Sequence, residues 1–262
     1  MQKRIIILLF LIFILQSSVV VFADSTISVD SKTGIAIIKA DVNNKGPLMV
    51  LIEKGSERYQ YPITPGKDIY LPLQMGNGDY KIRITEKIAE YTYKQIKEYK
   101  HTLKLEDNNV VYLTSILEVN WNKDQELIKK AAEITKGLKT NESKIKAIHG
   151  YVSKNFSYDY DKASTVSFGY IPELSTLYTS KKGICYDYAS IFAAMSRSVG
   201  IPTKLVKGYG TITGKTYHAW NEVLLDGKWK IIDTTIDAPL VQSKKTVSVF
   251  KNTKDYKVSR YY

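Results

Sequence analysis

From residue 25 to about 118 the chain runs in short segments where polar and apolar residues alternate, the pattern of half-buried β-strands. Tyr80, Ile82 and Ile84, for example, alternate with Lys81 and Arg83. Comparable segments, rich in Ile, Val, Tyr and Thr, occupy 33–42, 47–55, 58–63, 68–73, 79–88, 90–106 and 109–119. Turn-forming residues such as Gly and Asn separate them. Short strands at this spacing predict a β-sandwich.

From residue 122 the apolar spacing changes to three and four residues, which is typical of amphipathic helices. Segments 122–138 and 141–156 both follow it. His149 lies beside the apolar face of the second segment, and we expect it to be a partly buried packing residue. His101, within the alternating region, is expected at the surface. Residues 157–182 are irregular and aromatic and predict a loop that lines a cleft.

A third helix is predicted over 185–199, beginning at the chain's single cysteine, Cys185, shortly after Gly183. A lone cysteine excludes an internal disulfide and leaves an inert thiol, an intermolecular link or a nucleophile. The unpaired N–H groups and positive dipole end of a helix start stabilise a thiolate and can receive an oxyanion. Asp187, in the same turn, opposes the thiolate charge but suits the helix dipole.

The dipeptide Asp226–Gly227, flanked by apolar alternation, predicts a β-hairpin with a two-residue loop. Leu225 then pairs with Lys228. Continuing this register along both strands makes His218 and Asp233 diagonal neighbours on one face of the sheet. Such neighbours lie roughly 7–8 Å apart at the backbone, within reach of a hydrogen bond between imidazole and carboxylate.

These placements suggest a catalytic triad. Cys185 is the candidate nucleophile, and His218 on a strand is the candidate base that takes and returns the proton. Asp233, on the adjacent strand, is the candidate group that orients the imidazole. The alternative is that all three are ordinary packing residues.

The sequence resembles the transglutaminase-like superfamily of cysteine enzymes. Three blocks carry the resemblance, in family order: "GICYDYASIFAAMSRSVGIPTKLVKGY", "YHAWNEVLLDGKW" and "IIDTT". The match covers about 122–237, and Thr234 departs from it, since many members have proline there. The resemblance implies an α+β, papain-like fold in which a thiol on a helix packs against an antiparallel sheet. It also implies triad roles for Cys185, His218 and Asp233, a thioester intermediate, and no need for a cofactor or metal.

The first 23 residues read as a secretory signal peptide. Lys3 and Arg4 precede an uninterrupted apolar run, and Ala23 is a small residue at the expected cleavage site. A retained membrane anchor is the alternative, although the run is short of the roughly 20 residues that a spanning helix needs. We therefore predict three parts: a signal peptide at 1–23, a β-sandwich-like domain at 24–118 and a transglutaminase-like catalytic domain at 119–262. The protein is expected to be secreted or associated with the cell wall.

The formal charge of the chain is +12, and removing Lys3 and Arg4 leaves +10. The basic residues are scattered, and export makes nucleic acid an unexpected partner. A basic exported protein suits an anionic surface such as a cell-wall polymer, while a solvated basic surface is the plainer interpretation. The three histidines are far apart and lack ligand spacing, so no metal site is predicted.

The favoured function is an exported cysteine enzyme that acts on amide bonds of protein or cell-wall peptides. It would be a peptidase or amidase, or a protein-glutamine transamidase. The alternative is a binding or scaffold module that keeps the fold without turnover. A wall peptidase of the NlpC/P60 kind is disfavoured because no "DCSG"-like block occurs. The sequence leaves open whether the reaction is hydrolysis or transamidation, what the substrate is and what the N-terminal domain does. It also leaves open the second oxyanion donor, for which Tyr158 and Tyr160 are unranked candidates.

Overall fold

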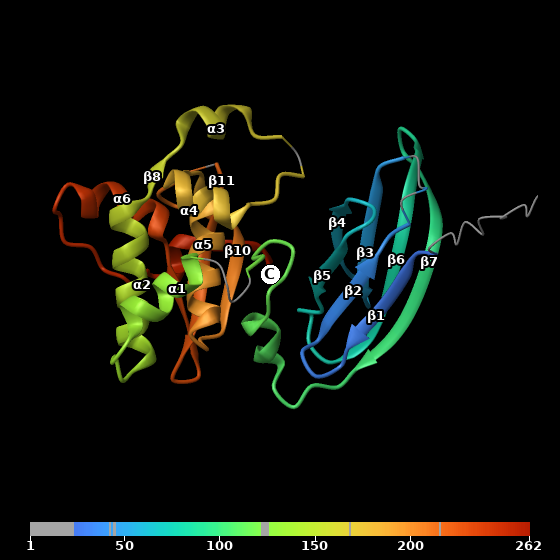
Figure 1. Cartoon of the computed structure of the whole chain (residues 1–262), viewed down its shortest axis with the longest axis horizontal. Coiled ribbons are helices and arrows are strands. Elements are labelled where there is room, and N and C mark those ends of the chain that lie inside the picture. The colour runs from blue at the N-terminus through green and yellow to red at the C-terminus, as the bar shows by residue number, and fades with distance from the viewer. Residues whose placement is uncertain (1–23, 42, 44–45, 122–125, 168, 215) are drawn as a thin grey trace, which may run out of the picture.

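The computed structural model describes residues 24–262 except 42, 44–45, 122–125, 168 and 215. The predicted signal peptide at 1–23 lies outside the described residues. Strands β1 to β7 gather on one side of the molecule, and the helices and later strands gather on the other (Figure 1). This α+β arrangement confirms the predicted fold class. The domain boundary between 118 and 119 stays a prediction.

The N-terminal part is a two-sheet β structure. A three-stranded sheet has the order β1-β2-β5, and a four-stranded sheet has the order β4-β3-β6-β7, with antiparallel pairing throughout. Val50, Ile52, Ile82 and Ile84 are completely buried, as their alternation predicted. The strands are β1 (Thr26–Asp30), β2 (Ile35–Lys39), β3 (Leu48–Lys54), β4 (Glu57–Ile63), β5 (Asp68–Pro72), β6 (Gly78–Ala89) and β7 (Thr92–Leu103).

The strand predicted at 109–119 is wrong. Residues Asn108–Leu113 form a 3-10 helix, η1, whose start is capped because the Asp107 side chain accepts a hydrogen bond from the Asn109 N–H at 2.8 Å. Val111 and Ile116 are buried at a spacing that does not fit a period of two. The side-chain cap from Asp107 and the burial of unevenly spaced apolar residues therefore outweigh the strand preference of the β-branched residues in 109–119.

The C-terminal part packs helices against an antiparallel sheet of order β12-β11-β10-β13. Helix α5, which is buried along almost its whole length, lies against this sheet, and α1, α2, α4 and α6 pack around it. The helices are α1 (Glu126–Thr135), α2 (Asn141–Asn155), α3 (Tyr160–Thr165), α4 (Leu174–Ser180), α5 (Cys185–Ser198), α6 (Thr234–Gln242) and the 3-10 turn η2 (Thr253–Asp255). The strands are β8 (Ser157–Tyr158), β9 (Lys182–Gly183), β10 (Thr203–Gly210), β11 (Tyr217–Leu225), β12 (Lys228–Ile232) and β13 (Tyr256–Tyr261).

The loop predicted at 157–182 contains regular structure that the sequence pattern did not indicate. It holds the two short helices α3 and α4, and its ends form the parallel pair β8-β9. Helix α3 begins where the Asp159 side chain accepts the Lys162 N–H at 3.0 Å. Each helix is too short for a clear apolar period, which is why periodicity missed them. No helix in the described part of the chain has the length and apolarity needed to cross a bilayer.

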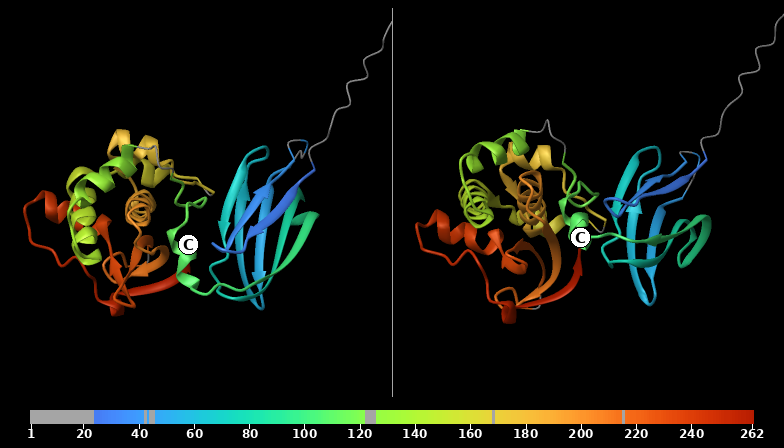
Figure 2. Two further views of the ribbon diagram at one scale, coloured as in Figure 1. Left: turned by 60° about the horizontal axis from the view of Figure 1, so that its bottom comes forward. Right: turned by 90° about the horizontal axis from the view of Figure 1, so that it is seen from below.

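The two parts of the molecule meet at an aromatic interface beside β13, where the label C lies between them in both views of Figure 2. The ring of Tyr262 makes edge-to-face contacts with Tyr59 and Tyr61 on β4, at centroid distances of 5.7 and 6.1 Å. Gln74 Nε2 also donates to the backbone carbonyl of Tyr261 at 3.3 Å. Because aromatic pairs of this geometry add to simple burial, the interface fixes β4 close to the sheet that contains β13.

Candidate active site

Cys185 is the first residue of α5 and is partly exposed. The residue before it, Ile184, donates its N–H to Asp187 Oδ2 at 2.8 Å, so Asp187 caps the helix start. A Cβ atom on Gly183 would lie 2.6 Å from the Asp187 Cβ, closer than such atoms approach. Glycine at 183 is therefore what lets the chain enter this turn, and the thiol stands among the free N–H groups of the first turn, as predicted.

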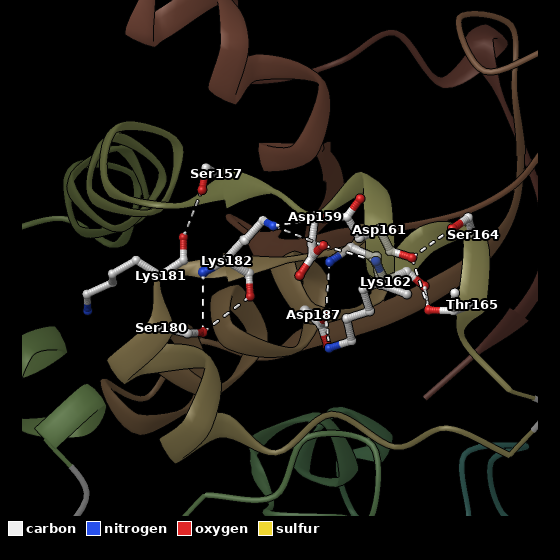
Figure 3. A network of polar contacts seen from close by, with 11 residues as sticks. Ser157, Asp159, Asp161, Lys162, Ser164, Thr165, Ser180, Lys181, Lys182 and Asp187 are labelled. Carbon is white, nitrogen blue, oxygen red and sulfur yellow. Dashed lines mark hydrogen bonds and ion pairs between the residues drawn. The ribbon is translucent and has the colours of Figure 1, made fainter.

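The negative charge of Asp187 is compensated by a neighbouring segment (Figure 3). Lys162 Nζ, on α3, lies 2.7 Å from Asp187 Oδ2. The hydroxyl of Tyr170 donates to Asp187 Oδ1 at 2.5 Å. The sequence suggested that Asp187 opposes a thiolate. In the structure this opposition is offset by Lys162, and the same contacts hold residues 160–170 beside the helix start.

The hairpin of β11 and β12 has the predicted register. Leu225 pairs with Lys228, and Asn221 pairs with Ile232. Asp226 and Gly227 both have positive φ, at 51° and 72°. Positive φ at both central residues is the requirement of a type I′ turn, so the Asp–Gly signal was interpreted correctly.

Asp233 reaches His218 by a route that differs from the prediction. Strand β12 ends at Ile232, and Asp233 is the N-cap of α6 rather than a strand residue. Its Oδ1 accepts the Ile236 N–H at 3.2 Å, and its Oδ2 lies 2.7 Å from His218 Nε2. The strand extension was wrong because aspartate is a strong N-cap former, and the chain turns into a helix at this point.

A further contact to this pair comes from Tyr256 on β13, whose hydroxyl donates to Asp233 Oδ2 at 3.0 Å. Sequence reasoning missed Tyr256, and no motif near it could have shown it. With Asp233 on Nε2, the His218 Nδ1 is the nitrogen left for Cys185. Burial alone would lower the pKa of His218, but hydrogen bonds to Asp233 and Cys185, and the charges of both, raise it to about 10.

A cavity of about 740 Å³ opens on Cys185 and His218. Ile212, Ile236 and Pro239 supply apolar wall, while Tyr158 and Tyr160 line it from the segment before α5. Tyr160 is 77% exposed, whereas burial, and next the charge of Cys185, raise the pKa of Tyr158. Of the two tyrosines left unranked by the sequence, Tyr158 is the less exposed in the cavity wall.

Residues 128–234 match the model of a family described as the transglutaminase-like superfamily. This part of the chain is transglutaminase-like. The recognition made from the three sequence blocks is thereby confirmed, and the match supports a cysteine enzyme in general. It does not name a reaction.

Two curated relatives match parts of this chain. The kyphoscoliosis peptidase of Mus musculus is 29% identical over 116 residues, which is 41% of this chain and 17% of that protein. The UPF0252 protein MJ1282 of Methanocaldococcus jannaschii is 33% identical over 137 residues, which is 48% of this chain and 38% of that protein. The chain thus matches well under half the length of either relative.

Solved structures show distant similarity. A Cytophaga hutchinsonii protein proposed to be a cysteine protease is 16% identical and has a TM-score of 0.45, covering 84% of each chain. Red sea bream transglutaminase is 11% identical with a TM-score of 0.33, covering 77% of this chain and 48% of its own. With identities of 16% and 11% and TM-scores of 0.45 and 0.33, these structures do not indicate the activity of this chain.

The other two histidines, His101 and His149, do not line the cavity that holds Cys185. His149 is buried, and its Nε2 lies 2.8 Å from Asp237 Oδ2, with Lys251 Nζ 2.6 Å from the other oxygen. His101 is half-buried on β7 and lies 3.4 Å from the Ser31 hydroxyl. Within the described residues, no three His, Cys, Asp or Glu side chains come together as ligands for a metal ion.

Proposed function

We propose that the protein is an exported cysteine enzyme that cleaves or exchanges amide bonds in protein or cell-wall peptides. Cys185 is the nucleophile, His218 transfers the proton and Asp233 orients the imidazole. One observation carries the proposal. His218 Nε2 lies 2.7 Å from Asp233 Oδ2, and His218 and Cys185 line the same cavity of about 740 Å³.

The chemistry follows from this arrangement. Cys185 Sγ forms a bond to the amide carbonyl carbon, and the carbonyl electron pair moves onto oxygen beside the N–H groups of the first α5 turn. The C–N bond then breaks, and His218 gives its proton to the leaving nitrogen. Water or a second amine attacks the thioester, its proton passes to His218, and the C–S bond breaks to restore the thiolate. Tyr158 is our candidate for a second donor to the oxyanion.

Export and wall association are part of the proposal and rest on the sequence. The apolar run before Ala23 supports secretion, and the charge of +10 that remains without Lys3 and Arg4 supports contact with an anionic wall polymer. We expect the intact mass of the protein from culture supernatant to correspond to a chain that starts at Asp24. A secreted mass that still includes residues 1–23 would contradict this part.

The second candidate is a binding module that keeps the fold without turnover. Alkylation by iodoacetamide separates the two candidates without knowledge of the substrate. An unassisted thiol, with a pKa near about 8.5, is almost fully protonated at pH 6, and only thiolate reacts. At pH 6 we expect Cys185 in the parent to alkylate at least about tenfold faster than in His218→Ala, because the imidazolium stabilises the thiolate.

His149→Ala is the matched control, since it removes a buried histidine from the other pair and leaves the thiol with its partner. It should alkylate at the parental rate. Equal rates at pH 6 in the parent and in His218→Ala would remove the triad assignment and favour the binding module.

A further inference from the structure

A second cavity, of about 330 Å³, lies between the two parts of the molecule. Gln60, Tyr61 and Pro62 on β4 form one wall, so neither part makes the cavity alone. Ile184 and Tyr186, the residues on either side of Cys185, line the opposite wall. The cavity therefore lies beside the first turn of α5, which carries Cys185.

The cavity shares one residue with the cavity that holds the thiol. Tyr217 on β11, next to His218, lines both. A molecule in the second cavity would thus lie one side chain away from the reacting centre. A volume of this size falls at the small end of ligand sites, which are roughly 300–1,000 Å³.

The cavity contains a buried carboxylate without a hydrogen-bond partner. Glu118 is only 3% exposed, and its Oε2 has no partner among the described residues. The nearby guanidinium of Arg197 does not satisfy it, because Arg197 donates to the backbone carbonyls of Thr203, Thr114 and Tyr262. The Tyr186 hydroxyl, which lines the same cavity, is also buried with no hydrogen-bond partner in the described part of the chain. Unpaired buried polar groups are costly, and two lining one cavity indicate a place for a polar ligand.

The same cavity contains an ammonium group that forms no ion pair with any described residue. Lys207 Nζ, from β10, lies 3.6 Å from the ring centroid of Tyr186 and 5.0 Å from that of Tyr262. Burial lowers its pKa to about 8, and burial raises the pKa of Glu118 to about 7. Each charge moderates the other's shift, yet the two side chains are not in contact as a salt bridge. Both charged forms would gain from a partner of opposite sign.

We infer that this cavity binds an α-amino-acid head group, with the ammonium beside Glu118 and the carboxylate beside Lys207. A ligand with one charge would compensate one buried group and repel the other, whereas a zwitterion compensates both. The inference rests on the proposed function in one respect. An amino acid, or a peptide end that carries this head group, is the amine that an amide-cleaving enzyme releases or a transamidase accepts.

The experiment measures binding, without chemistry, on the full chain carrying Cys185→Ala. Calorimetric titrations with alanine, N-acetylalanine and alaninamide compare the zwitterion with forms that lack the ammonium or the carboxylate. We expect alanine to bind at least about tenfold more tightly than either blocked form, because each blocked form leaves one buried charge of the cavity without its partner. Equal affinity for any blocked form, or no saturable heat with alanine, would overturn the inference.

Two variants assign the charges. Glu118→Gln should remove the preference for alanine over N-acetylalanine, and Lys207→Met should remove the preference over alaninamide. Glu222→Gln and Lys204→Met are matched controls, because Lys204 is a second half-buried lysine on β10 that stands over Trp229 and pairs with Glu222 outside the cavity. If the controls reduce alanine binding as much as the cavity variants do, the assignment is wrong.

The outcome of the binding experiment does not depend on whether the protein is an enzyme. Since Cys185→Ala has no thiol, failure of the alkylation test leaves the binding result standing, and the reverse also holds. Should Glu118→Gln or Lys207→Met fail to fold, as shown by loss of near-ultraviolet circular dichroism, the comparison of the three ligands on the Cys185→Ala protein still decides.

Discussion

The molecule contains two buried histidine–aspartate pairs of nearly equal geometry. His218 Nε2 lies 2.7 Å from Asp233 Oδ2, and His149 Nε2 lies 2.8 Å from Asp237 Oδ2. The two aspartates stand four residues apart at the start of the same helix, α6. A histidine hydrogen-bonded to a buried carboxylate is therefore no sign of catalysis by itself.

The surroundings separate the two pairs. His218 faces Cys185 and a 740 Å³ cavity, and Tyr256 adds a donor to Asp233. Asp237 instead holds the ammonium of Lys251, and the Ser153 hydroxyl, 3.5 Å away and buried, is a further polar contact of His149. The lesson is that a nucleophile and access for substrate define the candidate site, whereas the other pair ties α2 to α6.

The largest expected difference between the pairs is in turnover. Asp233→Asn should lower turnover of any amide substrate that the parent accepts by up to about 10⁴-fold, because an amide can hold the imidazole in the wrong tautomer. Asn caps helices about as well as Asp, so folding should survive. Asp237→Asn should leave turnover within a few-fold of the parent.

Steady-state kinetics on the folded variants, with thermal melts as a control, make this comparison. If Asp237→Asn lost as much turnover as Asp233→Asn, the two pairs would act as one unit and the separation drawn above would fail.

The second difference is in the free energy of unfolding, and here Asp237→Asn is expected to have the larger effect. Asp237→Asn leaves the buried His149 and Lys251 without their carboxylate, and loss of one partner of a buried ion pair costs about 3–5 kcal/mol. Asp233→Asn keeps its cap and a polar partner for His218, so we expect a cost of about 1–2 kcal/mol when both variants are compared at pH 10, where the imidazolium of the parent is losing its proton. Urea unfolding monitored by circular dichroism measures both. A smaller loss in Asp237→Asn than in Asp233→Asn would contradict the structural role of the His149 pair.

The third difference is a pH dependence of stability that belongs to the His218 pair. The pKa of His218 is raised from 6.5 to about 10 in the folded protein, so the folded state binds its proton more tightly. This contribution is fully present below pH 6.5 and is lost as the pH rises through about 10. We expect the free energy of unfolding to fall between pH 6.5 and 10 in the parent, and the fall to be clearly shallower in His218→Gln.

Thr216→Ala, a change in the wall of the same cavity that leaves the ionisable groups in place, is the control and should keep the parental slope. Urea titrations at three pH values suffice. An identical slope in His218→Gln and the parent would mean that other groups carry the pH dependence.

The hairpin and the Cys185 helix were predictable because both depend on local signals. The Asp226–Gly227 loop sets the register of its two strands, and the apolar spacing after Cys185 sets the helix. From these, the approach of His218 and Asp233 followed. The prediction placed Asp233 on a strand, whereas it is the N-cap of α6. Alternation of apolar residues along a strand does not indicate that a helix begins at Asp233.

The rest of the site depends on contacts between distant segments. Tyr256, Lys162 and Tyr170 reach the site from other elements, and no spacing in the sequence connects them to it. Glu118 and Lys207 are likewise brought together only when two parts of the molecule meet. Such proximity is set by tertiary packing, which periodicity and turn signals do not encode.

Helix α6 has a consequence for how this protein can change over evolutionary time. Because a helix turns once in about 3.6 residues, one inserted residue between Asp233 and Asp237 would rotate one carboxylate by about 100° relative to the other. Whichever carboxylate kept its position after such an insertion, the other would lose its contact with its histidine. Among homologues that keep both pairs, we expect the four-residue interval to be free of gaps, while insertions and deletions accumulate in the exposed turn between β10 and β11.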